Sequence, residues 1–356
     1  MMRMAYRNMI YKIRWLLVAQ FLLLVPLTTS KVPAIIAFGD SYSDAGNNNA
    51  IPTLLKSNFK PYGRHFPGGH PTGRFCDGRL PPDFISEAFG LKPTIPAYLD
   101  PAYTIPDFAT GVCFASSGTG YDNATSDVFN VIPMWKELEY YKDYQNKLRA
   151  YLGNEKANEI LSEALYLLSL GTNDFLINYY IFPTRRSQFT IQEYEDFLVG
   201  LSGNFIRDLY NLGARKISLT GVPPLGCLPL ERLTNILQHH DCNEKYNNVA
   251  LEFNGKLTNL VRRLNKELRG ITIVFADSYH SIDQMITRPS LYGFEEVGVA
   301  CCSTGTFEIS YLCSEHNPLT CSDANKYVFW DAFHPTEKTN RIVVDHYIDS
   351  LLVSFR

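Results

Sequence analysis

Short apolar segments alternate with long amphipathic segments along most of the chain. Each apolar segment has the length of a buried strand, and most lack the polar alternation of a strand with one face in water. The predicted strands are residues 34–38, 111–115, 165–170, 216–220 and 271–275. Helices are predicted at residues 81–90, 135–151, 191–212, 244–268 and 336–352. Strands that alternate with helices predict an α/β fold with a parallel sheet of about five strands, flanked by helices.

No linker, internal repeat or low-complexity segment divides the chain after its first thirty residues. We therefore expect a single domain over residues 31–356. The long connection 43–80 is rich in Gly, Pro and Asn, and we expect it to be an ordered excursion on the surface.

Residues 1–30 differ in character from the rest of the chain. Basic residues, the last of them Arg14, precede a short apolar run over 15–25, and small residues follow up to Ser30. This order is typical of a secretory signal peptide, cleaved near Ser30. The alternative is a membrane anchor, but the run is short of the roughly 20 apolar residues of a spanning helix. We expect a secreted, extracellular protein with no stable membrane span.

The eight cysteines of the chain fit an oxidising compartment. Cys76 and Cys113 stand apart, and the other six crowd the C-terminal half: Cys227, Cys242, Cys301, Cys302, Cys313 and Cys321. Disulfides are favoured over a zinc site, because no Cys-x-x-Cys pair is present. We predict a bridge between Cys227 and Cys242 and pairing among the other four, whose partners the sequence leaves open.

Charge and acceptor motifs add two smaller points. The net charge of −3 and the absence of a basic run argue against a nucleic-acid partner. The sequence Asn123-Ala124-Thr125 is a predicted glycosylation site at Asn123.

Candidate chemistry lies where the predicted strands end. In an open parallel sheet, ligands bind at the carboxyl ends of the strands. The first strand runs into Gly39-Asp40-Ser41, and the third into Gly171-Thr172-Asn173-Asp174. Near the C-terminus, Asp331 precedes His334 by three residues, so a tight turn would let the carboxylate orient the imidazole. Each of these motifs alone is more typical of an ordinary turn than of a catalytic site.

Together, in this order, the motifs resemble the four blocks of the GDSL esterase/lipases, also called SGNH hydrolases. The blocks are Phe38-Gly39-Asp40-Ser41, Gly111-Val112-Cys113-Phe114-Ala115-Ser116-Ser117-Gly118, Gly171-Thr172-Asn173-Asp174 and Asp331-Ala332-Phe333-His334-Pro335. Two further stretches, residues 72–75 and 221–227, are similar to the plant branch of that family. Tyr42 replaces the leucine of the family name, and Ser117 replaces a common glycine.

The resemblance implies a three-layer α/β/α fold with a five-stranded parallel sheet and hydrolysis of acyl esters through an acyl-enzyme. Ser41 would be the nucleophile, His334 the general base and Asp331 the group that orients His334. The amides of Ser41 and Gly118 and the side chain of Asn173 would form the oxyanion hole, with Ser117 as the alternative to Gly118. This chemistry needs no cofactor and no metal. Asp40 and the three asparagines of residues 47–49 would shape the loop.

Two other functions use the same sequence features. An acyltransferase would carry the same residues and pass the acyl group to an alcohol in place of water. A non-catalytic secreted binding protein would be expected to lack one of Ser41, Asn173 and His334, and all three are present. The substrate, a small or polymeric acyl ester, and the oligomeric state are left open by the sequence.

Overall fold

The computed structural model describes residues 32–235 and 241–355. The predicted signal peptide lies outside these ranges. Within the described ranges, no helix is long and apolar enough to cross a membrane. The described residues from Val32 onward pack as one compact unit.

A five-stranded parallel sheet forms the centre of the fold, as predicted. Its strands, in the spatial order β2-β1-β3-β4-β5, are β2 (Gly111–Cys113), β1 (Ile35–Gly39), β3 (Leu165–Ser169), β4 (Lys216–Thr220) and β5 (Thr272–Ala276). All five residues of β1 are buried, which explains why the strand reads as a continuous apolar run. The strand order reverses at β1, so the carboxyl end of β1 is the expected ligand position.

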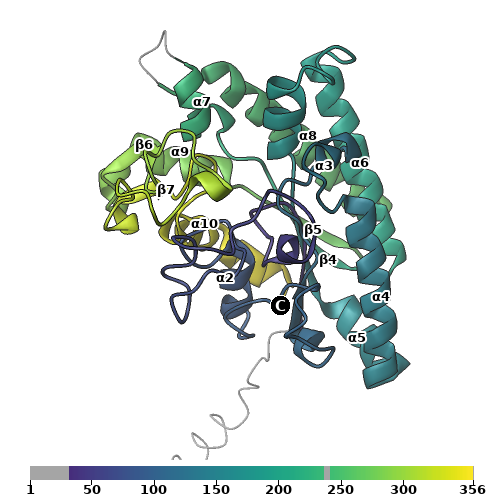
Figure 1. The fold of residues 1–356 in the computed structure, drawn as a ribbon. Coiled ribbons are helices and arrows are strands. Elements are labelled where there is room, and N and C mark those ends of the chain that lie inside the picture. The colour runs from purple at the N-terminus through teal and green to yellow at the C-terminus, as the bar shows by residue number, and fades with distance from the viewer. Residues whose placement is uncertain (1–31, 236–240, 356) are drawn as a thin grey trace, which may run out of the picture. The chain divides into compact units, whose positions relative to one another are not determined.

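Helices cover both faces of the sheet and give the three-layer α/β/α architecture (Figure 1). On one face, Phe38 of β1 packs against Tyr141 and Phe205, which belong to α4 and α6. On this face lie α4 (Met134–Leu152), α6 (Ile191–Asn211) and α8 (Glu244–Glu267), with α5 (Asn154–Glu163) beside α4. On the other face lie α2 (Pro81–Ala88), α9 (Tyr279–Thr287) and α10 (Glu337–Phe355).

The predicted helices all occur, with ends shifted by a few residues. The capping box of Thr190 and Glu193 fixes the start of α6, and the side chain of Asn243 caps α8. The sequence pattern did not predict α3 (Asn123–Phe129), α5, α7 (Pro229–Thr234) and α9. The shorter helical turns are Asn47–Ala50, Asp107–Thr110, Leu225–Cys227, Pro289–Tyr292, Ser310–Leu312 and Ala324–Lys326, and a π-helix spans Asp174–Ile181.

A second, two-stranded parallel sheet was also not predicted. It pairs β6 (Glu296–Ala300) with β7 (Tyr327–Phe329). Two disulfides, Cys301–Cys321 and Cys302–Cys313, cross-link the segment between these strands. The third disulfide joins Cys227 to Cys242 before α8, and Cys76 and Cys113 are free and buried. β7 leads directly into the turn that carries His334.

Candidate active site

Ser41 lies in a tight loop at the carboxyl end of β1. The loop begins at Gly39, whose φ of +132° places the position of a Cβ only 2.2 Å from the carbonyl oxygen of Ser169 on β3, so only glycine fits there. The Oδ1 atom of Asp40 accepts a hydrogen bond from the Tyr42 amide at 3.0 Å. The Asp40 carbonyl accepts the amides of Ser43 and Asp44. Asp40 therefore shapes the turn that presents Ser41, as its predicted structural role requires.

His334 and Asp331 lie in one turn between β7 and α10. Asp331 Oδ1 accepts the backbone amides of Phe333 and His334 at 2.9 and 2.8 Å, which folds the turn back on itself. The Nδ1 atom of His334 is 2.8 and 2.9 Å from the two carboxylate oxygens of Asp331. The Nε2 atom of His334 is 2.8 Å from the Oγ atom of Ser41. The structure thus aligns a hydroxyl, an imidazole and a carboxylate that are all buried.

Tyr62 contacts this group of residues, although sequence reasoning gave it no role. Its hydroxyl donates a hydrogen bond to Asp331 Oδ2 at 2.7 Å and accepts the amide of Ser310 at 2.9 Å. Burial and the neighbouring Asp331 raise the pKa of Tyr62 well above its usual value, so the phenol stays protonated and donates. Tyr62 lies in the Gly- and Pro-rich excursion 43–80, 269 residues before Asp331 in the sequence. No sequence signal marks it.

The candidate oxyanion donors Gly118 and Asn173 line the same cavity as Ser41. In the described part of the chain, the backbone amides of Ser41 and Gly118 have no hydrogen-bond partner. The amide of Ser117, the sequence-based alternative, instead donates to Asp44 Oδ2 at 2.9 Å, which leaves Gly118 as the candidate donor of this loop. Asn173 donates from Nδ2 to the carbonyl of Thr119 at 3.0 Å, and this bond fixes its orientation.

Asparagine side chains join the Ser41 loop to the Gly118 loop. Asn47 donates from Nδ2 to the carbonyls of Cys113 and Ala115 at 2.9 and 2.8 Å. Asn48 accepts the Ser116 hydroxyl and donates to the Ser117 carbonyl. These contacts confirm the structural role expected of the asparagines. They also give a physical reason for the polar string after β1, since these side chains bond to backbone carbonyls of the neighbouring loop.

Buried carboxylates also accept hydrogen bonds from the Ser41 loop and the Gly118 loop. Burial raises the pKa of Asp40 to about 8 and that of Asp174 to about 7. Asp174 accepts the amides of Tyr121 and Asp122 and the hydroxyl of Thr125. It therefore connects the Gly118 loop to the π-helix that follows Asn173.

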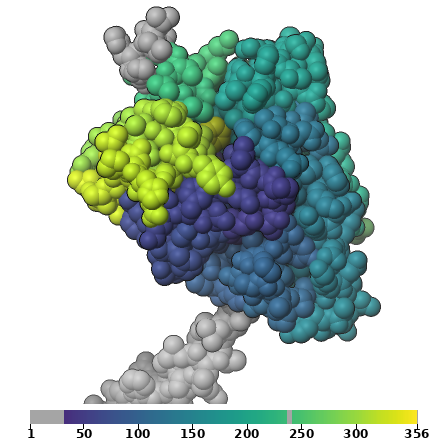
Figure 2. All heavy atoms as spheres, in the orientation of Figure 1, coloured from purple at the N-terminus to yellow at the C-terminus, as the bar shows by residue number. Residues whose placement is uncertain are grey.

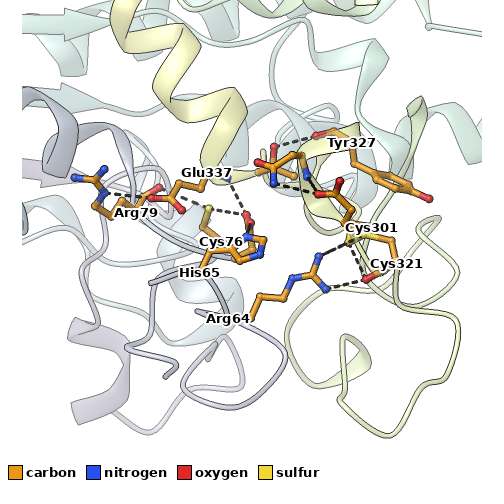
Figure 3. A network of polar contacts seen from close by, with 12 residues as sticks. Arg64, His65, Cys76, Arg79, Cys301, Cys321, Tyr327 and Glu337 are labelled. Atoms are coloured by element: carbon orange, nitrogen blue, oxygen red, sulfur yellow. Dashed lines mark hydrogen bonds and ion pairs between the residues drawn. A yellow bond between two sulfur atoms is a disulfide. The ribbon is translucent and has the colours of Figure 1, made fainter. Parts of the chain in front are cut away.

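Part of the 43–80 excursion contacts the segments on either side of the turn of His334, at Cys321 and at Glu337. Asp77 accepts the amide of Glu337 at the start of α10, and it pairs with His65, whose pKa this hydrogen bond raises. The guanidinium of Arg64 donates to the carbonyl of Cys321, beside the Cys301–Cys321 disulfide (Figure 3). The excursion is therefore ordered, as expected, but it is not confined to the surface, because Tyr62, Phe75 and Cys76 are buried.

An apolar cavity of about 250 Å³ opens beside Ser41 and His334. Its polar lining includes Asn173, and Gly118 lies in its wall. The apolar lining comes from Leu55, Phe75, Phe129, Ile177, Phe307, Ile309, Leu312 and Phe333. Figure 2 shows the yellow-green segment that precedes α10 lying against the purple segment that follows β1. The cavity has the composition of a site for the apolar part of a substrate.

The predicted glycosylation site, Asn123, is not among the residues that line this cavity. The side chain of Asn123 is exposed at the first residue of α3, and the helix is capped by Asp122. Thr125 of the same motif is buried and donates to Asp174.

Comparison with known proteins identifies the family. A family model described as GDSL-like Lipase/Acylhydrolase matches residues 35–347. Three GDSL esterase/lipases of Arabidopsis thaliana are 61%, 58% and 58% identical to the chain, over 92%, 96% and 91% of its length and 94%, 97% and 93% of theirs. Among solved structures, an extracellular lipase from Streptomyces rimosus covers 88% of this chain at 13% identity and a TM-score of 0.36. On the family model and the Arabidopsis relatives, the chain belongs to the GDSL lipase/acylhydrolase family of carboxylic ester hydrolases.

Proposed function

We propose that the protein is a secreted serine esterase that hydrolyses acyl esters through a covalent acyl-enzyme. The observation that carries this proposal is the 2.8 Å distance between Ser41 Oγ and His334 Nε2, with the Asp331 carboxylate on the other ring nitrogen. A serine hydroxyl becomes an effective nucleophile when a positioned imidazole takes its proton.

The proposed reaction has two half-reactions. Ser41 Oγ attacks the ester carbonyl carbon while its proton passes to His334 Nε2. The amides of Ser41 and Gly118 and the Asn173 side chain stabilise the oxyanion that forms. His334 then gives the proton to the leaving alcohol as the carbon–oxygen bond breaks. In the second half-reaction, His334 takes a proton from water, the hydroxide attacks the acyl-enzyme, and the acid leaves as Ser41 is reprotonated.

Secretion is part of the proposal. The order of basic, apolar and small residues over 1–30 supports it, as do three disulfides, which persist in oxidising compartments. N-terminal sequencing of the secreted protein should find a start close to Lys31, whereas a chain that retains Trp15 would contradict cleavage.

Hydrolysis of p-nitrophenyl esters of graded chain length tests the activity. The purified protein should release p-nitrophenol with burst kinetics, and Ser41→Ala should reduce the rate to near the uncatalysed level. A matched control is Ser126→Ala, since the buried Ser126 hydroxyl has no hydrogen-bond partner in the described part of the chain. Product analysis with an added alcohol separates the reactions: free acid supports a hydrolase, and the exclusive formation of a new ester would contradict it in favour of a transferase.

A further inference from the structure

A surface groove of about 780 Å³ lies between α4 and the segment 98–108, which precedes β2. Among the residues that the structure describes, none that lines the cavity beside Ser41 also lines this groove. The groove therefore has no part in the reaction proposed above, and its lining must be explained in another way.

Tyrosine side chains make up much of the lining, and we call this hollow the tyrosine groove. The four tyrosines are Tyr98, Tyr103, Tyr140 and Tyr151. Tyr103 and Tyr151 are 43% and 51% exposed, so their rings are available to a ligand. A tyrosine ring offers a large, rigid contact area and loses little conformational freedom on binding.

Charged groups lie among these rings. Asp100, Asp143 and Lys147 also line the tyrosine groove. The Nζ atom of Lys147 is 2.6 Å from the Asp143 carboxylate and donates to the Tyr98 hydroxyl at 3.0 Å, and this hydroxyl donates to Asp143. An ammonium and a carboxylate have further donor and acceptor positions beyond these bonds, so the groove can exchange hydrogen bonds with a ligand.

The fold holds both walls of the tyrosine groove. On one side, the Tyr98 amide donates to the Cys113 carbonyl and the Cys113 amide donates to the Pro96 carbonyl, both at 2.9 Å, which ties this wall to β2. On the other side, the groove residues of α4 follow one another at intervals of three or four positions, so they share one face of the helix. The groove is therefore a built feature of the folded chain.

The tyrosine groove continues into a second hollow of about 290 Å³, because both are lined by Asp100 and Tyr103. Polar residues such as His70 and Thr72 line this second hollow. Together the two hollows are suited to an extended chain more than to a single small molecule.

The charges of the tyrosine groove limit which kind of chain fits. Within the described part of the protein, its charged lining consists of two carboxylates and one ammonium. A nucleic acid or an acidic polysaccharide would meet this excess of negative charge. A purely apolar ligand would instead remove water from Asp100 and Asp143 without replacing its hydrogen bonds.

We propose that the tyrosine groove binds a neutral, β-linked polysaccharide of the glucan or xylan type, at a site separate from Ser41. The sugar rings of such a chain have flat C–H faces that pack on aromatic rings. Their edges carry hydroxyls that exchange hydrogen bonds with carboxylate and ammonium groups. This inference does not depend on the proposed function, since the groove shares no lining residue with the cavity beside Ser41.

Native electrophoresis in gels that contain hydroxyethyl cellulose or soluble xylan tests this binding. Wild type should be retarded in at least one of the two gels. Tyr103→Ala and Tyr151→Ala should each raise the dissociation constant roughly fivefold, as expected for the loss of one aromatic contact. Tyr151→Phe should bind like wild type, because it keeps the ring. The matched control is Tyr311→Ala, since Tyr311 is 56% exposed and lines neither hollow.

The midpoint of thermal unfolding, measured for each variant, should match that of wild type and shows that weaker binding is not caused by loss of the fold. No retardation of wild type in either gel would overturn the proposal. Equal retardation of Tyr103→Ala, Tyr151→Ala and Tyr311→Ala would overturn it too, because the chain would then bind elsewhere. Stronger retardation by polygalacturonate, an acidic polysaccharide, than by both neutral chains would contradict the proposed class of ligand.

Discussion

At the scale of single residues, the phenol of Tyr62 contacts Asp331 because folding brings together two residues that are far apart in the sequence. It donates to the carboxylate oxygen of Asp331 that makes no backbone hydrogen bond within the turn. Asp331 then has both oxygens held, one by its own turn and one by Tyr62. We infer that Tyr62 is a positioning residue, which acts on His334 through Asp331.

Tyr62→Phe should lower kcat roughly tenfold with little change in KM, because a hydrogen bond to a charged group contributes about 1.5 kcal/mol or more. The acid limb of the pH–rate profile should also shift, which a loss of packing alone would not cause. Tyr42→Phe is the matched control, since the buried Tyr42 hydroxyl has no hydrogen-bond partner among the residues described. An unchanged kcat and pH profile in Tyr62→Phe would contradict the positioning role.

Asn173 carries the second prediction at this scale. Asn173→Ala should reduce kcat by roughly 10² to 10³ with KM nearly unchanged, because the lost donor would act on the oxyanion of the transition state. Asn49→Ala serves as the control, since the Asn49 side-chain amide donates to the Thr72 carbonyl in an exposed part of the 43–80 excursion. A rate loss below threefold in steady-state kinetics of Asn173→Ala would remove it from the oxyanion hole.

At the scale of elements, the sequence predicts those strands and helices whose signal lies within a few neighbouring residues. The apolar run of β1 and the capping residues of α6 and α8 each act within a few residues, so their elements were predictable. β6 and β7 were not, because β6 has a single buried residue and contains a glycine, and β7 has three residues. Likewise, the order of motifs singled out Ser41 and His334, whereas Tyr62 reaches Asp331 only through the folding of a long irregular excursion.

The loop between β6 and β7 carries a prediction about specificity. Cys302→Ala/Cys313→Ala should lower the free energy of unfolding by about 3 kcal/mol. It should also lower the kcat/KM ratio of octanoyl to acetyl ester roughly fivefold, because Ile309 and Leu312 would no longer hold the cavity wall against a long chain. Cys227→Ala/Cys242→Ala should lose similar stability in a denaturant titration and keep the ratio. An equal ratio in both double variants would contradict this role of the loop.

At the scale of the whole molecule, buried carboxylates make folding stability depend on pH. Burial raises the pKa of Glu231 to about 7 from an ordinary value of 4.5. Between these values the folded chain holds a proton that the unfolded chain has lost, so stability falls as the pH rises from about 4.5 to 7. Asp40 and Asp174 act in the same direction over pH ranges that end near 8 and 7.

Glu231→Gln removes one of these carboxylates. Relative to wild type, its free energy of unfolding should increase between pH 5 and pH 8, by on the order of 2 kcal/mol. Urea titrations at both pH values measure this difference, with the exposed Glu252→Gln as the control. A difference between variant and wild type that does not change with pH would show that Glu231 keeps an ordinary pKa in the fold.

The central claim is that Ser41 is the residue that becomes acylated, with His334 as its base. Labelling with a fluorophosphonate, followed by peptide mass spectrometry, tests it most directly. The folded protein should take up one label, on the peptide that contains Ser41, and Ser126→Ala should label at the wild-type rate. Ser41→Ala should take up none, and His334→Ala should label far more slowly than wild type. A label on a different residue, or unchanged labelling of Ser41→Ala, would contradict the account.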